Sequence, residues 1–301
     1  MCGVIGLLLR DPSLEPRLGE LLVPMIEALD ERGPDSSGIA VYGDPAVVDG
    51  PPLLRVSLGA DEEVDWLGVG CSLLDVAASG AELHRFGAGL VLDLPEDSLA
   101  AVQQQLAVEW PQVRVLGTGW NLRVLKDTGR PTDTCSRYAI GSWDGYLAVA
   151  HTRMATESAV TVLHSHPFVP SRDLCVVHNG SFSNYATVRR HLVDDGVGFD
   201  SDNDSEVAAR YLASRLEFGD DLEEATRWVM KEMDGFFTLV ITSADGMSVV
   251  RDAFACKPAV VAETPAYVAV ASEYRALAEL PGIEEATVFE PRPEEVYTWR
   301  R

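Results

Sequence analysis

The second residue of the chain is a cysteine, and its position gives it unusual chemical options. Because cysteine is small, we expect Met1 to be removed and Cys2 to become the amino terminus. A free α-amine has a pKa of about 7.7–8.0, so it can accept a proton near neutral pH. It lies within reach of the thiol of the same residue, which then supplies both nucleophile and general base. If Met1 stayed in place, that nitrogen would be an amide and could not act as a base.

Several short polar motifs accompany this cysteine, and each of them alone is a weak signal. They occur in the order CGVIG at 2–6, RGPDSSG at 32–38, HTRMAT at 151–156, HNG at 178–180 and DNDSE at 202–206. Together, with a cysteine at position two, they resemble the class II glutamine amidotransferases. The resemblance covers most of the chain outside a segment at about 55–145.

The resemblance implies roles for three of the residues. Cys2 matches the nucleophile that attacks the side-chain amide of L-glutamine to form a γ-glutamyl thioester. Asn179 and Gly180 match the oxyanion hole, and an amide group and a backbone N–H are fixed donors suited to that task. Taken alone, Asn179 and Gly180 would be turn residues, and the two interpretations are compatible.

The glutamine pocket is implied in the same way. Arg153 matches the residue that holds the substrate α-carboxylate, since a guanidinium can donate two parallel hydrogen bonds to it. Thr156 matches a further polar contact, and Asp204 matches the acid that binds the α-ammonium group. The competing interpretations are a surface ion pair for Arg153 and a helix cap for Asp204, a role also open to Ser201 and Asp202.

Other residues of these motifs have supporting or structural roles. Arg32 matches an arginine near the nucleophile, and a surface ion pair is its alternative. Many members of the resembled family carry Trp where this chain has Met154, so the pocket cover is expected to be less rigid here. The histidines of the motifs are interpreted as structural, without a role as base or metal ligand: His151, His164, His166 and His178.

The remaining cysteines do not suggest a disulfide framework or a zinc site. The chain has five cysteines, an odd number at wide spacing, and none lies in a CxxC pair. This usage favours a reduced, cytoplasmic protein in which the other thiols are inert or packed: Cys71, Cys135, Cys175 and Cys256.

The charge of the chain limits its partners. With 24 Lys and Arg against 47 Asp and Glu, the net charge is −23. Such a surface repels phosphates and anionic headgroups, so we expect no binding to nucleic acid or membrane surfaces. No apolar run approaches the roughly 20 residues of a membrane span, and the first residues lack the basic region of a signal peptide.

The elements that must position these residues follow from periodicity. Residues 3–9 form a short apolar run that predicts a buried strand, and spacings of three and four predict a helix up to Leu29 that RGPDSSG ends. Helices are expected near 183–194, 204–217 and 221–233. The strands after 235 follow each other at hairpin spacing, which favours antiparallel sheets and an α+β fold.

The resemblance refines this to a four-layer αββα sandwich, the fold of the N-terminal nucleophile hydrolases. We expect one amidotransferase domain over 1–301, with a small βαβ-containing insertion at 55–145. Phe86–Leu92 is expected to be one strand of that insertion.

The chain shows no site for an acceptor of the ammonia. It has no phosphate-binding GxxxxGK[ST] loop, no SGGxDS loop, no FMN barrel and no iron–sulfur cysteine set. The resemblance is strongest to the amidotransferase subunit of glutamate-synthase-like and N-methylglutamate synthase complexes. It implies delivery of ammonia, or of the glutamyl group, to synthase subunits that carry FMN and iron–sulfur centres, with no cofactor in this chain.

Three alternatives stay open. The chain could be a non-catalytic glutamine-sensing or scaffold subunit, or an N-terminal nucleophile hydrolase acting on another amide. In the third, an amine takes the place of water at the thioester.

Overall fold

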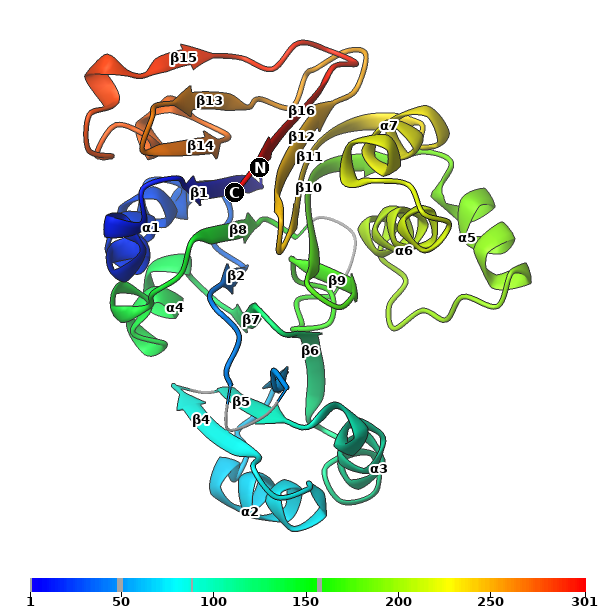
Figure 1. Ribbon diagram of the computed structural model, residues 1–301. Helices are drawn as coiled ribbons and strands as arrows, with labels where there is room; N and C mark the ends of the chain where they lie inside the picture. Colours follow the sequence, from blue (N-terminus) through cyan, green and yellow to red (C-terminus); the bar gives the residue numbers. More distant parts are fainter. Residues whose placement is uncertain (1, 48–50, 88, 156–158) are drawn as a thin grey trace.

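The structure is a computed structural model that describes residues 2–47, 51–87, 89–155 and 159–301. Two antiparallel sheets face each other in the upper part of Figure 1, and a smaller sheet with its own helices lies below them. In the described part of the chain, no helix is both long and apolar enough to cross a bilayer.

The larger sheet has seven strands in the order β15-β13-β14-β1-β8-β2-β7, all antiparallel. The apolar run predicted as a strand lies in its middle as β1, paired with β14 on one side and β8 on the other. Every residue of β1 is buried, which explains its continuous apolar sequence. The strands are β1 (Gly3–Leu9), β2 (Ser36–Tyr42), β7 (Leu122–Thr128), β8 (Leu147–Arg153), β13 (Val260–Glu263), β14 (Tyr267–Ala271) and β15 (Thr287–Phe289).

The second sheet has five strands in the order β16-β12-β11-β10-β9. The hairpin predicted after residue 235 is present here as β11–β12, and β9–β10 is a second one, whereas α5, α6 and α7 separate β10 from β11 along the chain. They are β9 (Phe168–Ser171), β10 (Leu174–Phe182), β11 (Gly235–Ser243), β12 (Gly246–Arg251) and β16 (Val296–Arg300).

Helices cover the outer faces of both sheets, so the fold is the predicted four-layer αββα sandwich (Figure 1). The helix α1 (Leu18–Glu27) and the shorter α4 (Pro131–Arg137) pack against the seven-stranded sheet. On the other side lie α5 (Tyr185–Asp194), α6 (Asp204–Glu217) and α7 (Leu222–Glu232). Apolar side chains of both sheets, among them Val4, Val149, Val177 and Val240, fill the layer between them.

The small unit at the bottom of Figure 1 carries a four-stranded antiparallel sheet in the order β4-β5-β3-β6. Each of its helices connects two parallel strands that have a third strand between them, a split βαβ arrangement. The range 55–145 expected for the insertion is longer than this unit, because β7 and α4 belong to the upper body. Its elements are β3 (Leu54–Gly59), α2 (Trp66–Val76), β4 (Glu82–Phe86), β5 (Gly89–Leu94), α3 (Leu99–Glu109) and β6 (Arg114–Gly119).

One local prediction was wrong, and one strand was not predicted. The single strand expected at Phe86–Leu92 is a hairpin, because Gly87 adopts φ 54° and reverses the chain between β4 and β5. The segment RGPDSSG follows the helix as expected, but from Ser36 onward it forms β2, which pairs with β7 and β8 and was not predicted. Pairing on both sides outweighs the weak strand propensity of its serines and glycine.

Candidate active site

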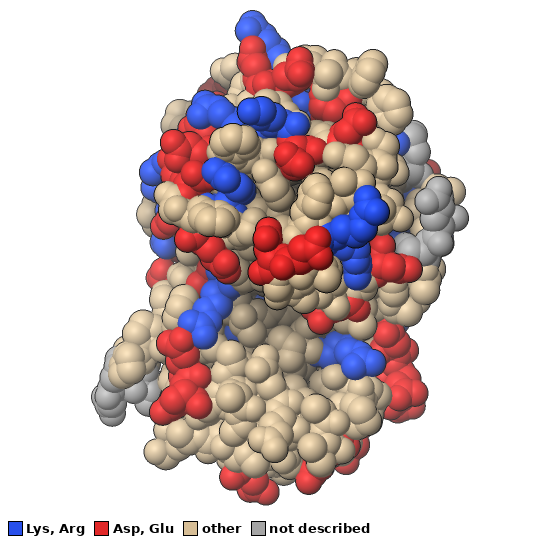
Figure 2. Space-filling view, turned by 90° about the vertical axis from the view of Figure 1, so that its right-hand side faces the viewer, with Lys and Arg blue, Asp and Glu red and all other residues tan. Residues whose placement is uncertain are grey.

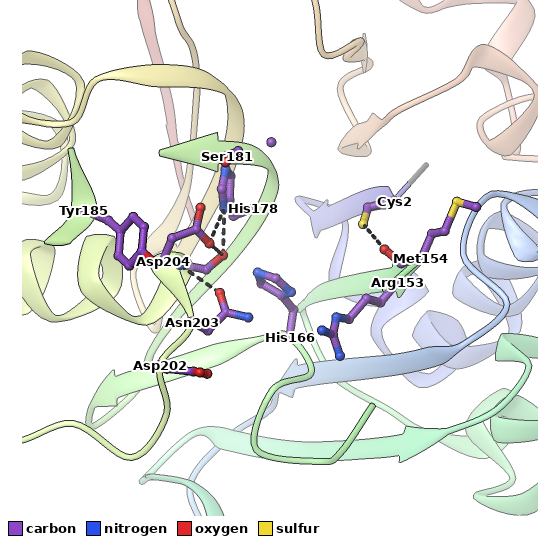
Figure 3. Close-up of a pocket in the computed structure, with 12 residues that line it drawn as sticks. Cys2, Arg153, Met154, His166, His178, Ser181, Tyr185, Asp202, Asn203 and Asp204 are labelled. Carbon is purple, nitrogen blue, oxygen red and sulfur yellow. Dashed lines mark hydrogen bonds and ion pairs between the residues drawn. The ribbon is translucent and has the colours of Figure 1, made fainter. Parts of the chain in front are cut away.

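Cys2 lies immediately before β1, at the edge of the gap between the two central sheets. Its carbonyl oxygen accepts hydrogen bonds from Arg32 Nε at 3.0 Å and from Asn179 Nδ2 at 3.2 Å. Its thiol is a free, half-buried group that donates to the carbonyl oxygen of Met154 at 3.8 Å. The backbone of Cys2 is therefore fixed from two sides, while its sulfur faces a cavity (Figure 3).

Arg32 reaches Cys2 from the segment between α1 and β2. Its guanidinium also forms an ion pair with Glu273, which follows β14. The arginine side chain is 8% exposed, so this is not the surface ion pair considered as its alternative. Arg32 does not line the cavity, and its contact with the Cys2 carbonyl makes it a positioning residue.

β10 supplies the predicted oxyanion donors. It runs antiparallel to β11, with Asn179 opposite Thr238 and Gly180 opposite Phe237. Gly180 has φ 153°, and a Cβ atom there would lie 1.9 Å from the carbonyl oxygen of Phe236. Only glycine fits this position. Because the amide nitrogen of Asn179 carries two hydrogens, its bond to Cys2 leaves one N–H for another acceptor.

Arg153 is the last residue of β8 and is 5% exposed. Its Nη1 donates to the carbonyl oxygen of Ala159 at 2.8 Å, which fixes the guanidinium at the cavity wall. Burial lowers the pKa of Arg153 from its ordinary value, but an arginine so far above neutrality keeps its charge. Thr156, the other predicted pocket residue on this segment, lies outside the described residues.

Asp204 is the first residue of α6, on the opposite wall. The helix cap is its neighbour Asn203, whose side chain accepts from Ser205 N at 2.9 Å, so Asp204 is not needed as a cap. One Asp204 oxygen accepts from Phe182 N at 2.8 Å. The carboxylate is 22% exposed and lines the cavity.

The cavity between these walls has a volume of about 310 Å³, at the small end for ligand pockets. Four predicted residues line it: Cys2, Arg153, Gly180 and Asp204. In Figure 3, Cys2, Met154 and Arg153 lie on one side and Asp204 with His178 on the other. A cation and a carboxylate on opposite walls can hold the carboxylate and ammonium groups of an α-amino acid, with its side chain toward the thiol.

Three histidines form a buried cluster beside the cavity, with their rings tilted or edge-on to one another. The sequence did not predict their grouping. The ring centroids of His151 and His166 are 4.1 Å apart, and those of His166 and His178 are 6.3 Å apart. Burial lowers the pKa of His151 to about 3 and of His178 to about 4, and it holds that of His166 well below the ordinary value. All three are neutral near pH 7, as expected for structural histidines, although His166 and His178 also line the cavity.

Further lining residues lie within or beside the motifs, and they were not assigned a role because a single polar residue carries no signal of its own. They are Ser181, Tyr185, Asn203 and Ser205. Within the described ranges, no group of three or more His, Cys, Asp or Glu side chains is arranged to hold a metal ion.

Comparisons with known proteins indicate the family of the chain. A family model described as a glutamine amidotransferase domain matches residues 151–279. The chain is 44% identical over 299 residues to the glutamine amidotransferase-like protein GlxB of Rhizobium meliloti (strain 1021), covering 99% of this chain and 98% of that one. It is 32% identical over 315 residues to a putative glutamine amidotransferase of Methanothermobacter thermautotrophicus, covering 99% of each.

Solved structures show the same fold. The glutamine phosphoribosylpyrophosphate amidotransferase of B. subtilis superposes with a TM-score of 0.61 at 17% identity. The match covers 99% of this chain but only 49% of that one, so the chain spans about half the length of this neighbour.

Proposed function

Because this chain belongs to the class II glutamine amidotransferases, we propose that its cavity binds L-glutamine and that Cys2 is the nucleophile. The observation that carries the proposal is the placement of Cys2, Gly180, Arg153 and Asp204 around one cavity. Arg153 holds the α-carboxylate and Asp204 the α-ammonium, which directs the side-chain amide toward the sulfur.

The reaction proceeds in two steps. The Cys2 sulfur attacks Cδ of the substrate, and the oxyanion that forms accepts hydrogen bonds from the free N–H of Asn179 and the backbone N–H of Gly180. The α-amine of Cys2 takes the thiol proton and transfers it to the leaving ammonia, which requires prior removal of Met1. Water then attacks the γ-glutamyl thioester, so that glutamate leaves and the thiol is restored.

A direct test labels the nucleophile with a diazo ketone analogue of glutamine and measures the intact mass. We expect one adduct per chain, on a protein that lacks Met1. Cys2→Ala should abolish both labelling and glutaminase activity, whereas the control Cys71→Ala, which changes an exposed cysteine of α2, should retain both. Labelling that persists in Cys2→Ala contradicts the assignment.

We further propose that the ammonia is used by synthase subunits on another polypeptide, of glutamate-synthase or N-methylglutamate-synthase type. The support is the resemblance of the motifs at 2–6, 32–38, 151–156, 178–180 and 202–206 to the amidotransferase subunits of such complexes. Those subunits would carry the FMN and iron–sulfur centres, and the insertion formed by β3–β6, α2 and α3 is the proposed docking element.

Purification of the chain with its native partners tests this. We expect a stable complex with flavin and iron–sulfur absorbance, in which glutamine replaces free ammonium as nitrogen donor. Cys2→Ala should abolish the glutamine-dependent reaction and leave the ammonium-dependent one intact. A chain purified under the same conditions without any partner contradicts the proposal.

A further inference from the structure

A second cavity lies between the insertion and the central sheets, and we call it the insertion cleft. It has a volume of about 530 Å³ between β6, β9 and the amino-terminal side of α6. A recess of about 50 Å³ extends it inward, since most residues of the recess also line the cleft. Figure 2 faces this side of the molecule and shows a hollow above the insertion, with Lys and Arg side chains beside it. The cleft shares no lining residue with the Cys2 cavity.

Lys126 stands at the inner end of the cleft. It belongs to β7, is 6% exposed and lines the recess. Its Nζ lies 5.1 Å from the centre of the Phe168 ring. Among the described residues, no hydrogen bond or ion pair involves this ammonium group. A buried ammonium ion is stabilised by an anion that replaces its lost hydration, so the position favours an anionic ligand in the recess.

The carboxylates nearest to the recess already have partners. Glu206 accepts hydrogen bonds from Ser201 N and Asp200 N and pairs with Arg210 at 3.2 Å. Asp200 pairs with the same Arg210 at 2.7 Å. The two acids and this arginine therefore pair with one another, and neither acid forms an ion pair with Lys126.

A second cation lines the outer part of the cleft. Arg114, the first residue of β6, is exposed there, and no ion pair with a described residue involves it. The walls of the cleft combine apolar side chains, among them Val115, Leu163 and Val169, with the polar groups of Gln103, Thr118 and Ser171. Two cations in one continuous cleft, with apolar side chains on part of its walls, suit a ligand with two anionic ends and a short hydrocarbon linker.

We propose that the insertion cleft binds a small dicarboxylate, with one carboxylate on Lys126 Nζ and the other on the Arg114 guanidinium. This site is separate from the glutamine cavity and goes beyond the proposed glutaminase reaction. Inorganic phosphate shares the charge but lacks the linker and the second anionic group, so it should bind more weakly.

The protonation of Lys126 gives the site a pH dependence. Burial lowers the pKa of Lys126 to about 8, partly offset by the nearby Cys175, Glu206 and Asp200. Burial also raises the pKa of the Cys175 thiol to about 12 and keeps the His166 pKa well below its ordinary value, so both are neutral near pH 7. Binding should therefore weaken as the pH rises through about 8, when Lys126 loses its proton.

Calorimetric titration of the purified full chain with malonate, succinate, glutarate, adipate and phosphate tests the proposal. We expect one molecule per chain, with affinity that peaks at one linker length. Lys126→Met should weaken that binding by more than about tenfold, and Arg114→Gln should weaken the dicarboxylate but not phosphate. The control Lys231→Met, which changes a lysine of α7, should bind as the wild type does.

A second measurement needs no variant. The chain has three lysines, Lys126, Lys231 and Lys257, so reductive methylation is easily mapped to each. The best dicarboxylate should protect Lys126 alone. The proposal is overturned by the absence of saturation below about 10 mM, by equal binding to Lys126→Met, or by phosphate binding as tightly as every dicarboxylate.

Discussion

The Asn179 side-chain nitrogen lies 3.2 Å from the Cys2 carbonyl oxygen and so joins the two central sheets at the site. β10 belongs to the five-stranded sheet, whereas Cys2 leads into the middle strand of the seven-stranded one. The distance between nucleophile and oxyanion donors therefore depends on how the two sheets face each other. Substitutions of the cavity residues should therefore have separable effects on kcat, on glutamine binding and on the stability of the fold.

Asn179→Ala should lower kcat for glutamine hydrolysis by about 10²–10³ with a smaller change in KM, because one oxyanion donor is lost. Arg32 still holds the Cys2 carbonyl, so the fold should persist. Steady-state kinetics with circular dichroism measure both effects. Asn121→Ala, which removes a hydrogen bond to Gly43 far from Cys2, is the control. A kcat within twofold of wild type would show that Asn179 only positions the backbone.

Arg153→Lys should raise KM for glutamine by roughly 10- to 100-fold, because lysine cannot reproduce two parallel hydrogen bonds to a carboxylate. Inhibition by the product glutamate should weaken in parallel, since glutamate has the same α-carboxylate. Initial-rate kinetics at saturating glutamine should show a much smaller loss of kcat. A large fall in kcat at unchanged KM would argue against a binding role.

Asp204→Asn should weaken glutamine binding by about 10-fold or more, because the α-ammonium loses its opposite charge. The amide oxygen can still accept from Phe182 N, so the start of α6 should stay in place. The matched control is Asp202→Asn, since the Asp202 side chain is 84% exposed at the same cavity and pairs with His164. Titration with glutamine on a Cys2→Ala background measures binding alone. An equal loss of glutamine affinity in the two variants would indicate that only the net negative charge near the cavity matters, and not a direct contact of Asp204 with the substrate.

Gly180→Ala should destabilise the fold by about 1–3 kcal/mol, because the added Cβ meets the Phe236 carbonyl oxygen at 1.9 Å. Urea unfolding monitored by tryptophan fluorescence measures the change. Gly198→Ala is the control, since its Cβ would have no neighbour within 4 Å. A variant as stable as wild type would mean that β10 and β11 separate easily at this point.

The cluster of His151, His166 and His178 predicts that the free energy of unfolding decreases in acid. The folded-state pKa values of His151 and His178, about 3 and about 4, lie below the unfolded value of about 6.5. The unfolded state therefore binds more protons, and stability is lost as the pH falls from about 6.5 toward 4. His166→Gln should reduce this slope in urea midpoints measured across the range, whereas His84→Gln, at a half-exposed site, should not. An unchanged slope in His166→Gln contradicts the prediction.

Much of the fold could be predicted from periodicity, because β1 is buried throughout and α6 and α7 are regular amphipathic helices. β2 could not, since its serines and glycine form a strand only through pairing with two distant segments. The hairpin between β4 and β5 depends on one glycine at positive φ, Gly87.

Some residues of the site could also be predicted from the sequence, and others could not. Cys2, Arg153, Gly180 and Asp204 belong to motifs whose order points to one chemistry, and the structure places them around one cavity. The resemblance already placed His166 in a segment that shapes the pocket, but its grouping with His151 and His178 could not be predicted from the sequence, and neither could the place of Lys126 at a cavity. His166 is notable for the imidazole rings of His151 and His178 beside it. Lys126 is notable for a buried ammonium group that forms no ion pair with a described residue.

The ion pair between Arg32 and Glu273 has a consequence for protein synthesis. Cys2 leaves the ribosome first, yet the arginine that holds its carbonyl is paired with an acid more than two hundred residues later. A nascent chain therefore carries an exposed but unsupported thiol until its last strands emerge. We therefore expect glutaminase activity to appear only once synthesis has passed Glu273, which follows β14.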